Sequence, residues 1–170
     1  MKSKVKSIEV YILILLVSIE AAAALFGGYS LIKDPSGEQI KLPLSLLNGT
    51  IFGNYLIPGI ILFLVLGVVP LSLIYPLYFK PRLKFFNKLN IYTRYHWAWT
   101  YTLYFSIVHI IWINLQMMIL GTGSIMQGAT GMFGILILIV TLLPQVKSFY
   151  RINSTKKRVE LNKNEVKKIV

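Results

Sequence analysis

Cysteine is absent from this chain of 170 residues, and acidic residues and histidine are scarce. Without cysteine, disulfide bonds, zinc–cysteine sites and thiol catalysis are excluded. Only six residues are aspartate or glutamate and two are histidine. A metal site needs three or four converging ligands, and this composition predicts none. There is also no Ser-His-Asp set, glycine-rich phosphate loop or pair of intramembrane aspartates, so the sequence identifies no reaction.

Hydrophobic residues, in contrast, make up 55% of the chain, more than soluble proteins usually carry. They are concentrated in four blocks, at residues 8–32, 55–79, 97–120 and 128–150. A helix needs about 20 residues to cross the ~30 Å hydrocarbon core of a bilayer, and each block reaches that length. Backbone groups in lipid must be paired internally, which favours helices. The predicted fold class is therefore all-α, with four transmembrane helices within residues 1–150 and a basic cytoplasmic tail over residues 151–170.

The basic residues are distributed unevenly around these blocks. Lysine and arginine number 18, and the formal net charge is +12. If the chain crosses the membrane four times, all of them except Lys33 and Lys41 fall on one face. The positive-inside rule then places both termini in the cytoplasm. The prediction is a multi-pass protein of the plasma membrane.

The segment between the second and third blocks mixes basic with aromatic side chains. We interpret it as an interfacial belt whose lysines face anionic lipid headgroups. Leu83, Phe86 and Leu89 recur at helical spacing, which predicts a short surface helix. Nucleic-acid binding would require a basic stripe outside the membrane-flanking zones, and none occurs. The lipid bilayer, and not a nucleic acid, is therefore the expected partner.

The first block also resembles a secretory signal. Three lysines precede an apolar segment, and Ala21, Ala22 and Ala23 offer a cleavage site. Against cleavage, the apolar run continues to Ile32, and Glu20 interrupts the approach to the site. We therefore expect the first block to be retained as a membrane span.

The second block contains residues that shape helices. Pro70 lies inside it and predicts a kink, because proline lacks the N–H that the helix needs. Gly59 and Gly67 are eight residues apart, nearly on one helix face. Small residues there allow another helix to approach closely. We interpret these glycines as packing positions and not as a gating hinge.

One carboxylate, Glu20, lies near the middle of the first block. A charged side chain is costly at that depth, so it should face the interior of the bundle, with Ala23, Ala24 and Gly27 on the same face. The third block carries a polar stripe on one side of its helix, with a histidine at a similar depth. The members of this stripe are Thr102, Ser106, His109 and Gln116.

We predict that Glu20 faces His109, because a carboxyl group and an imidazole at one depth can satisfy each other. Two interpretations of the pair stay open. It is either an ionisable pair in a proton path or ligand pocket, or a hydrogen-bonded clamp between helices.

The second histidine argues against haem. His96 and His109 are 13 residues apart, which at ~100° per residue places them on roughly opposite faces of one helix. Haem in a membrane bundle would then require a second subunit or a different ligand. We expect no cofactor and no metal ion.

Residues 27–67 read GGYSLIKDPSGEQIKLPLSLLNGTIFGNYLIPGIILFLVLG. The Pro-Ser-Gly turn and the sequence Phe-x-x-Tyr-Leu-x-Pro-Gly, here residues 52–59, resemble a pattern in small uncharacterised four-helix membrane proteins of bacteria. The resemblance covers those 41 of the 170 residues. It implies a bacterial-type integral membrane protein and assigns no catalytic residue.

These features predict an integral membrane protein without naming its activity. A small transporter or a subunit of a membrane assembly is the preferred interpretation. Four helices rarely enclose a transport path alone, so transport implies a homo-oligomer or a partner membrane protein. The alternative is a small membrane enzyme that acts on a lipid or quinone, with His109 as acid/base and Glu20 orienting it. A cavity open beside His109 would favour the enzyme, and a closed contact a structural role.

Reporter fusions test the predicted topology. Fusions placed after Lys163 and within residues 33–54 should report opposite compartments, because the positive-inside rule holds the basic segments in the cytoplasm. Alkaline phosphatase and green fluorescent protein are suitable reporters, since each is active in only one of the two compartments. Finding both fusion sites in the same compartment would contradict four crossings with both termini inside.

Overall fold

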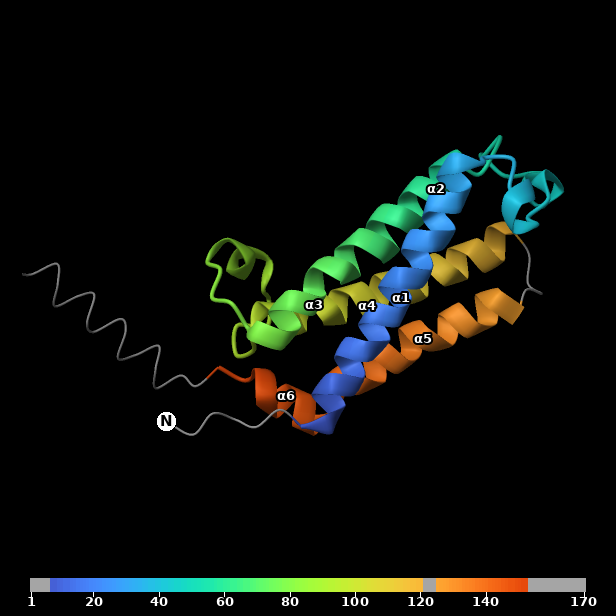
Figure 1. Cartoon of the computed structure of the whole chain (residues 1–170). Coiled ribbons are helices and arrows are strands. Elements are labelled where there is room, and N and C mark those ends of the chain that lie inside the picture. Colours follow the sequence, from blue (N-terminus) through green and yellow to red (C-terminus); the bar gives the residue numbers. More distant parts are fainter. Residues whose placement is uncertain (1–6, 121–124, 153–170) are drawn as a thin grey trace, which may run out of the picture.

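The computed structural model describes residues 7–120 and 125–152 and shows an all-helical protein (Figure 1). Within these ranges there is no strand, only an isolated bridge between Tyr95 and Arg151. The predicted all-α class is confirmed. Most of the predicted basic tail, from residue 153 onward, lies outside the described residues, as does the centre of the loop before the fourth block.

Two helices are long and apolar enough to cross a membrane, and they are α1 (Ile8–Lys33) and the helix Leu56–Phe79. A third candidate is a bent pair of helices, formed by α5 (Ile125–Leu142) and α6 (Pro144–Tyr150). The protein therefore carries two to three candidate membrane spans. α4 (Trp97–Leu120) has the necessary length but is not among them. Its sequence mixes histidine, asparagine and glutamine with tryptophan and tyrosine.

The helix Leu56–Phe79 changes its hydrogen-bond pattern along its length. It consists of α2 (Leu56–Ile61), the π-helix η3 (Leu62–Val68) and α3 (Val69–Phe79). At the end of the π-helix, the Val69 N–H donates to the Leu64 carbonyl, five residues earlier. Pro70 follows directly and cannot donate a backbone hydrogen bond. The sequence predicted a kink at Pro70; the structure has the wider turns of a π-helix just before the proline, in a helix that continues from Leu56 to Phe79.

Glycines bring α1 very close to this irregular helix, which lies beside it in Figure 1. A Cβ atom built on Gly28 would lie 2.6 Å from the backbone nitrogen of Phe63. One on Gly59 would lie 2.7 Å from Leu31 Cβ, and one on Gly67 would lie 2.8 Å from a Leu25 methyl carbon. The prediction that Gly59 and Gly67 allow close helix approach is confirmed.

The contact face of α1 differs in detail from the predicted one. Ala24 is buried beside Glu20 as expected, whereas Ala23 is exposed. Gly28, and not Gly27, makes the closest backbone approach, because a Cβ on Gly27 would meet only a Leu62 methyl group at 3.5 Å.

The fourth block, predicted as one helix over residues 128–150, is divided into two helices, which together are a candidate for a broken span. α5 ends at Leu142, and α6 begins at Pro144 with its axis turned by 63°. Leu143 between them is extended, with φ −56° and ψ 140°. The residue before a proline is disfavoured in the helical region because it clashes with the proline ring, which explains the break.

Two aromatic side chains close the helix ends near this break. The Trp99 indole N–H on α4 donates to the Thr141 carbonyl in the last turn of α5, at 2.8 Å. The Tyr150 hydroxyl on α6 donates to the Leu77 carbonyl in the last turn of α3, at 2.6 Å. The last carbonyls of a helix have no partner within it. These two bonds supply the missing donors and join α3, α4, α5 and α6 at one end of the bundle.

The Gly28 contact gives a stability prediction. Gly28→Ala should lower the free energy of unfolding by about 1–3 kcal/mol, because the new methyl group would overlap the Phe63 backbone. Gly128→Ala on α5 is the matched control. A Cβ there meets nothing within 4 Å, so alanine should leave stability unchanged or raise it by about 0.5–1 kcal/mol.

Thermal unfolding of both variants in detergent measures the difference. If Gly28→Ala is as stable as Gly128→Ala, the close contact between α1 and the π-helix does not exist in the folded protein.

Candidate functional site

Two ionisable side chains meet inside the bundle. Oε1 of Glu20 on α1 lies 3.5 Å from Nε2 of His109 on α4. Glu20 is 3% exposed and His109 is fully buried. The two helices belong to different parts of the chain, so the contact joins the N-terminal helices to the C-terminal ones. That this pair has a function stays a prediction, which we develop below.

The surroundings of His109 are tightly packed. A Cβ atom on Gly134 of α5 would lie 3.2 Å from Ile110 and 3.3 Å from Cγ of the imidazole, so α5 packs closely on this part of α4. The Phe105 ring lies on another side, with its centroid 5.8 Å from that of His109. Neither ring nitrogen makes a hydrogen bond of ordinary geometry within the described residues, although the Thr130 backbone of α5 lies beside the ring. Glu20 is therefore the polar side chain that faces His109.

The rest of the predicted polar stripe does not join this pair. Thr102 and Ser106 are fully buried, but their hydroxyl groups donate to carbonyls of their own helix. The acceptors are Ala98, at 2.8 Å from Thr102, and Leu103, at 2.8 Å from Ser106. Hydroxyl groups satisfied in this way can face apolar neighbours at little cost.

Gln116, the last member of the stripe, lies elsewhere. It lines a cavity of about 200 Å³ between the ends of α1 and α4, the start of α2 and the loop that precedes α2. The other lining residues are all apolar or aromatic, and they include Leu31, Tyr55 and Trp112. His109 is not among them. The cavity and the Glu20–His109 pair are thus separate features of the structure.

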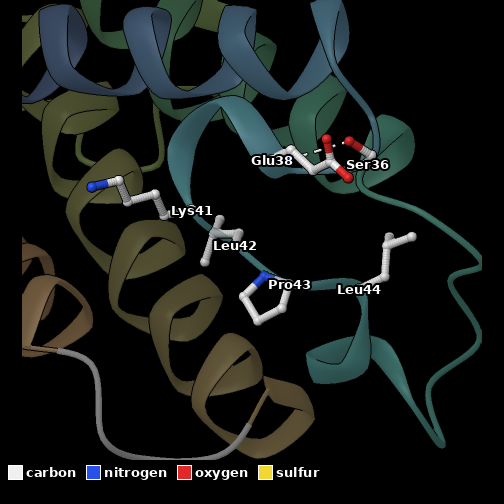
Figure 2. Close-up of a pocket in the computed structure, with 6 residues that line it drawn as sticks. All are labelled: Ser36, Glu38, Lys41, Leu42, Pro43 and Leu44. Carbon is white, nitrogen blue, oxygen red and sulfur yellow. Dashed lines mark hydrogen bonds between the residues drawn. The ribbon is translucent and has the colours of Figure 1, made fainter.

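A second, larger hollow of about 490 Å³ lies in the loop after α1, around the 3-10 helix η1 (Glu38–Ile40). Figure 2 shows Glu38 and Lys41 at opposite sides of it, pointing away from each other. Asp34 anchors the start of this loop. The Ser36 hydroxyl and the Gln39 backbone N–H donate to its carboxylate and hold the pKa of Asp34 below its ordinary value. The loop is ordered, but its charged side chains do not converge on one point.

The second histidine has a structural role that the sequence did not reveal. Nδ1 of His96 accepts the Ala98 N–H at 3.2 Å and so caps the start of α4. With Nδ1 accepting, Nε2 carries the proton and donates to the Pro81 carbonyl at 3.0 Å. The Trp97 indole N–H donates to the same carbonyl, also at 3.0 Å. His96 therefore lies at the helix end, with both nitrogens engaged.

Gly134 and His96 are the residues near these features that sequence analysis missed. The spacing of Gly131 and Gly134 in an apolar block could have indicated a close helix contact. The position of His96 directly before an apolar block could have indicated a cap.

Comparison with known proteins adds no assignment. No family model, no curated protein and no solved structure matches this chain. Among the described residues, no group of three or more histidine, aspartate or glutamate side chains is arranged to hold a metal ion. The resemblance to small bacterial membrane proteins stays a prediction.

The cap at His96 gives a prediction about pH. Burial lowers the pKa of His96 below its ordinary value of about 6.5. The folded protein therefore holds fewer protons than the unfolded chain just below that pH. The stability that neutral His96 contributes is complete above about pH 6.5 and is lost as the pH falls below it.

The unfolding temperature of the unmodified protein should accordingly be lower at about pH 5.5 than at about pH 7.5. His96→Asn should show a smaller difference, because asparagine retains an acceptor for the cap and does not titrate. Thr93→Asn, at an exposed position of the same loop, is the control and should keep the full difference. An unchanged pH dependence in His96→Asn would contradict this role of the imidazole.

Proposed function

We propose that the chain is a four-span protein of the plasma membrane with both termini in the cytoplasm, and that it works as a small transporter or as a subunit of a membrane assembly. In this proposal the Glu20–His109 contact is its proton-binding centre. The observation that carries the proposal is the burial of both side chains at 3.5 Å from each other on helices distant in sequence.

The cost of burial supports a role for this pair. Ionisable side chains inside a membrane are rare, face the interior of a bundle and mark ion or proton pathways. Glu20 and His109 together can bind one proton, either on the carboxyl group or on the imidazole, and each state leaves a donor facing an acceptor. An apolar pair would fill the same space without the cost of desolvation. The pair therefore supports a role in binding and releasing a proton.

The path of the chain supports four crossings. α3 ends at Phe79, the next segment folds back, and α4 starts at Trp97 at the same end of the molecule (Figure 1). Of the described basic residues, those of the segment 80–96 and of α6 lie at that end, which the positive-inside rule assigns to the cytoplasm. α4 completes a third crossing in this arrangement, and the bent pair of α5 and α6 a fourth.

The alternative, an enzyme that uses His109 on a lipid or quinone, requires access to the imidazole. His109 is fully buried, and it lines neither of the two cavities described above. The geometry therefore disfavours a catalytic pocket and leaves the pair as a closed contact between α1 and α4.

Substitution of Glu20 separates its chemistry from its packing. Glu20→Gln should fold with nearly unchanged stability, because an amide can still bond the imidazole. Glu20→Leu should lose about 1–3 kcal/mol of unfolding free energy, since it leaves His109 buried without a polar partner. Thermal unfolding in detergent measures both effects.

Infrared difference spectra between acidic and alkaline pH then report the proton itself. The unmodified protein should show the band of a buried protonated carboxyl group, Glu20→Gln should lack it, and His109→Gln should shift it. Glu38→Gln, at an exposed position, should keep it. If Glu20→Gln leaves the spectra unchanged, the pair does not bind a proton, and if Glu20→Leu is fully stable, it is not a polar contact either.

A further inference from the structure

The segment between α3 and α4, residues 80–96, is strongly basic and contains no acidic residue. We call it the basic loop. Four of its cationic side chains are exposed, and they are Arg82, Lys84, Lys88 and Arg94. A surface of this kind attracts anions and repels other cations.

The same loop exposes large apolar side chains between its cations. Phe85 is 73% exposed, Leu89 69% and Ile91 78%. Phe85 lies next to a cation, since the Lys88 ammonium is 5.8 Å from its ring centre. Exposed apolar side chains among basic ones are typical of segments that lie in the boundary between headgroups and acyl chains.

Hydrogen bonds within the loop and to α4 hold the loop in the arrangement that exposes these side chains. The Thr100 hydroxyl donates to the Asn90 side chain at 2.6 Å, and Asn90 in turn donates to the Tyr95 carbonyl. The hydroxyl groups of Tyr101 and Tyr104 donate to further carbonyls of the loop, at 3.2 and 3.1 Å.

An aromatic contact adds to this fixation. The Phe86 ring stacks on Trp97, with centroids 4.5 Å apart. Part of the apolar surface of the loop is thus used to fix it against α4. The remainder, including Phe85 and Leu89 at the two ends of the 3-10 helix η4 (Phe85–Leu89), is exposed.

We propose that the basic loop binds the headgroups of anionic phospholipids in the membrane that holds the protein. Leu89 and Ile91 enter the apolar boundary, while Lys84 and Lys88 meet the phosphate groups. The proposal rests on the proposed membrane topology but not on proton binding by Glu20 and His109.

The mixture of side chains favours lipid over nucleic acid as the anion. Proteins that bind single strands offer free aromatic faces on which bases stack. In this loop Phe86 and Trp97 already stack on each other, and the most exposed apolar side chains include the aliphatic residues Leu89 and Ile91. Aliphatic side chains gain more from an acyl layer than from a base.

The test uses the full chain in nanodiscs of equal parts phosphatidylglycerol and phosphatidylcholine. Native mass spectrometry after release into mild detergent counts the lipids of each kind that remain bound. The unmodified protein should retain phosphatidylglycerol in preference. Lys84→Gln with Lys88→Gln should reduce that preference roughly fivefold or more, because each lysine near an anionic surface contributes an attraction of that order.

Lys33→Gln with Lys41→Gln is the matched control. It removes the same charge from exposed positions on the other side of the proposed membrane, and it should keep the preference. Leu89→Asn with Ile91→Asn should weaken retention of both lipids without changing their ratio. The unfolding temperature of each variant checks that the fold is intact.

If both double lysine variants retain phosphatidylglycerol and phosphatidylcholine in the same ratio, the proposal is wrong. Binding of duplex DNA that is lost in Lys84→Gln with Lys88→Gln while lipid retention stays constant would also overturn it, since the anion would then be a nucleic acid. Glu20→Gln should retain phosphatidylglycerol like the unmodified protein. A failure of the proton-binding proposal is therefore distinguishable from a failure of this one.

Discussion

Two backbone carbonyls near helix ends have no hydrogen-bond donor within their own helices, and the structure depends on side chains that supply one. Leu77 would normally pair with the N–H four residues later, but that residue is Pro81, so Tyr150 supplies a hydroxyl instead. Thr141 loses its helical partner where the chain turns before Pro144, and Trp99 supplies an indole N–H. A buried carbonyl without a donor costs about 1–3 kcal/mol. Large aromatic side chains with one polar atom meet this need and fill the surrounding space.

α1 makes two different kinds of contact with its neighbours, a close backbone contact with one helix and a contact between polar side chains with another. α1 and the π-helix approach so closely at Gly28 that backbone lies against backbone. On its neighbouring face α1 presents Glu20 to His109, and Gly134 leaves room for the imidazole. A contact made by glycines has one geometry, whereas a contact between a carboxyl group and an imidazole changes with a proton. α1 thus combines a close contact made by glycine with a contact between two ionisable side chains.

Sequence reasoning succeeded where one residue type has few possible environments. Gly59 and Gly67 in an apolar block indicated packing, and Glu20 in a span had to face a polar side chain in the interior. It failed where either of two neighbouring positions could make the same helix contact, and where a side chain bonds to the backbone of its own helix. Gly27 and Gly28 differ by a single step around the helix, and only the partner helix decides between them. Thr102 and Ser106 share a face with His109, but the sequence did not show that their hydroxyl groups donate to carbonyls of their own helix.

The bond between Tyr150 and Leu77 also fixes an order of events during synthesis. The two residues are 73 positions apart, so α3 leaves the ribosome well before its last turn can be completed. Until Tyr150 is made, the Leu77 carbonyl lacks the donor that it has in the folded protein. For the bond between Trp99 and Thr141 the order is reversed, because the donor is made first and the carbonyl follows 42 positions later. The last turn of α3 is therefore completed only after α6 has been made.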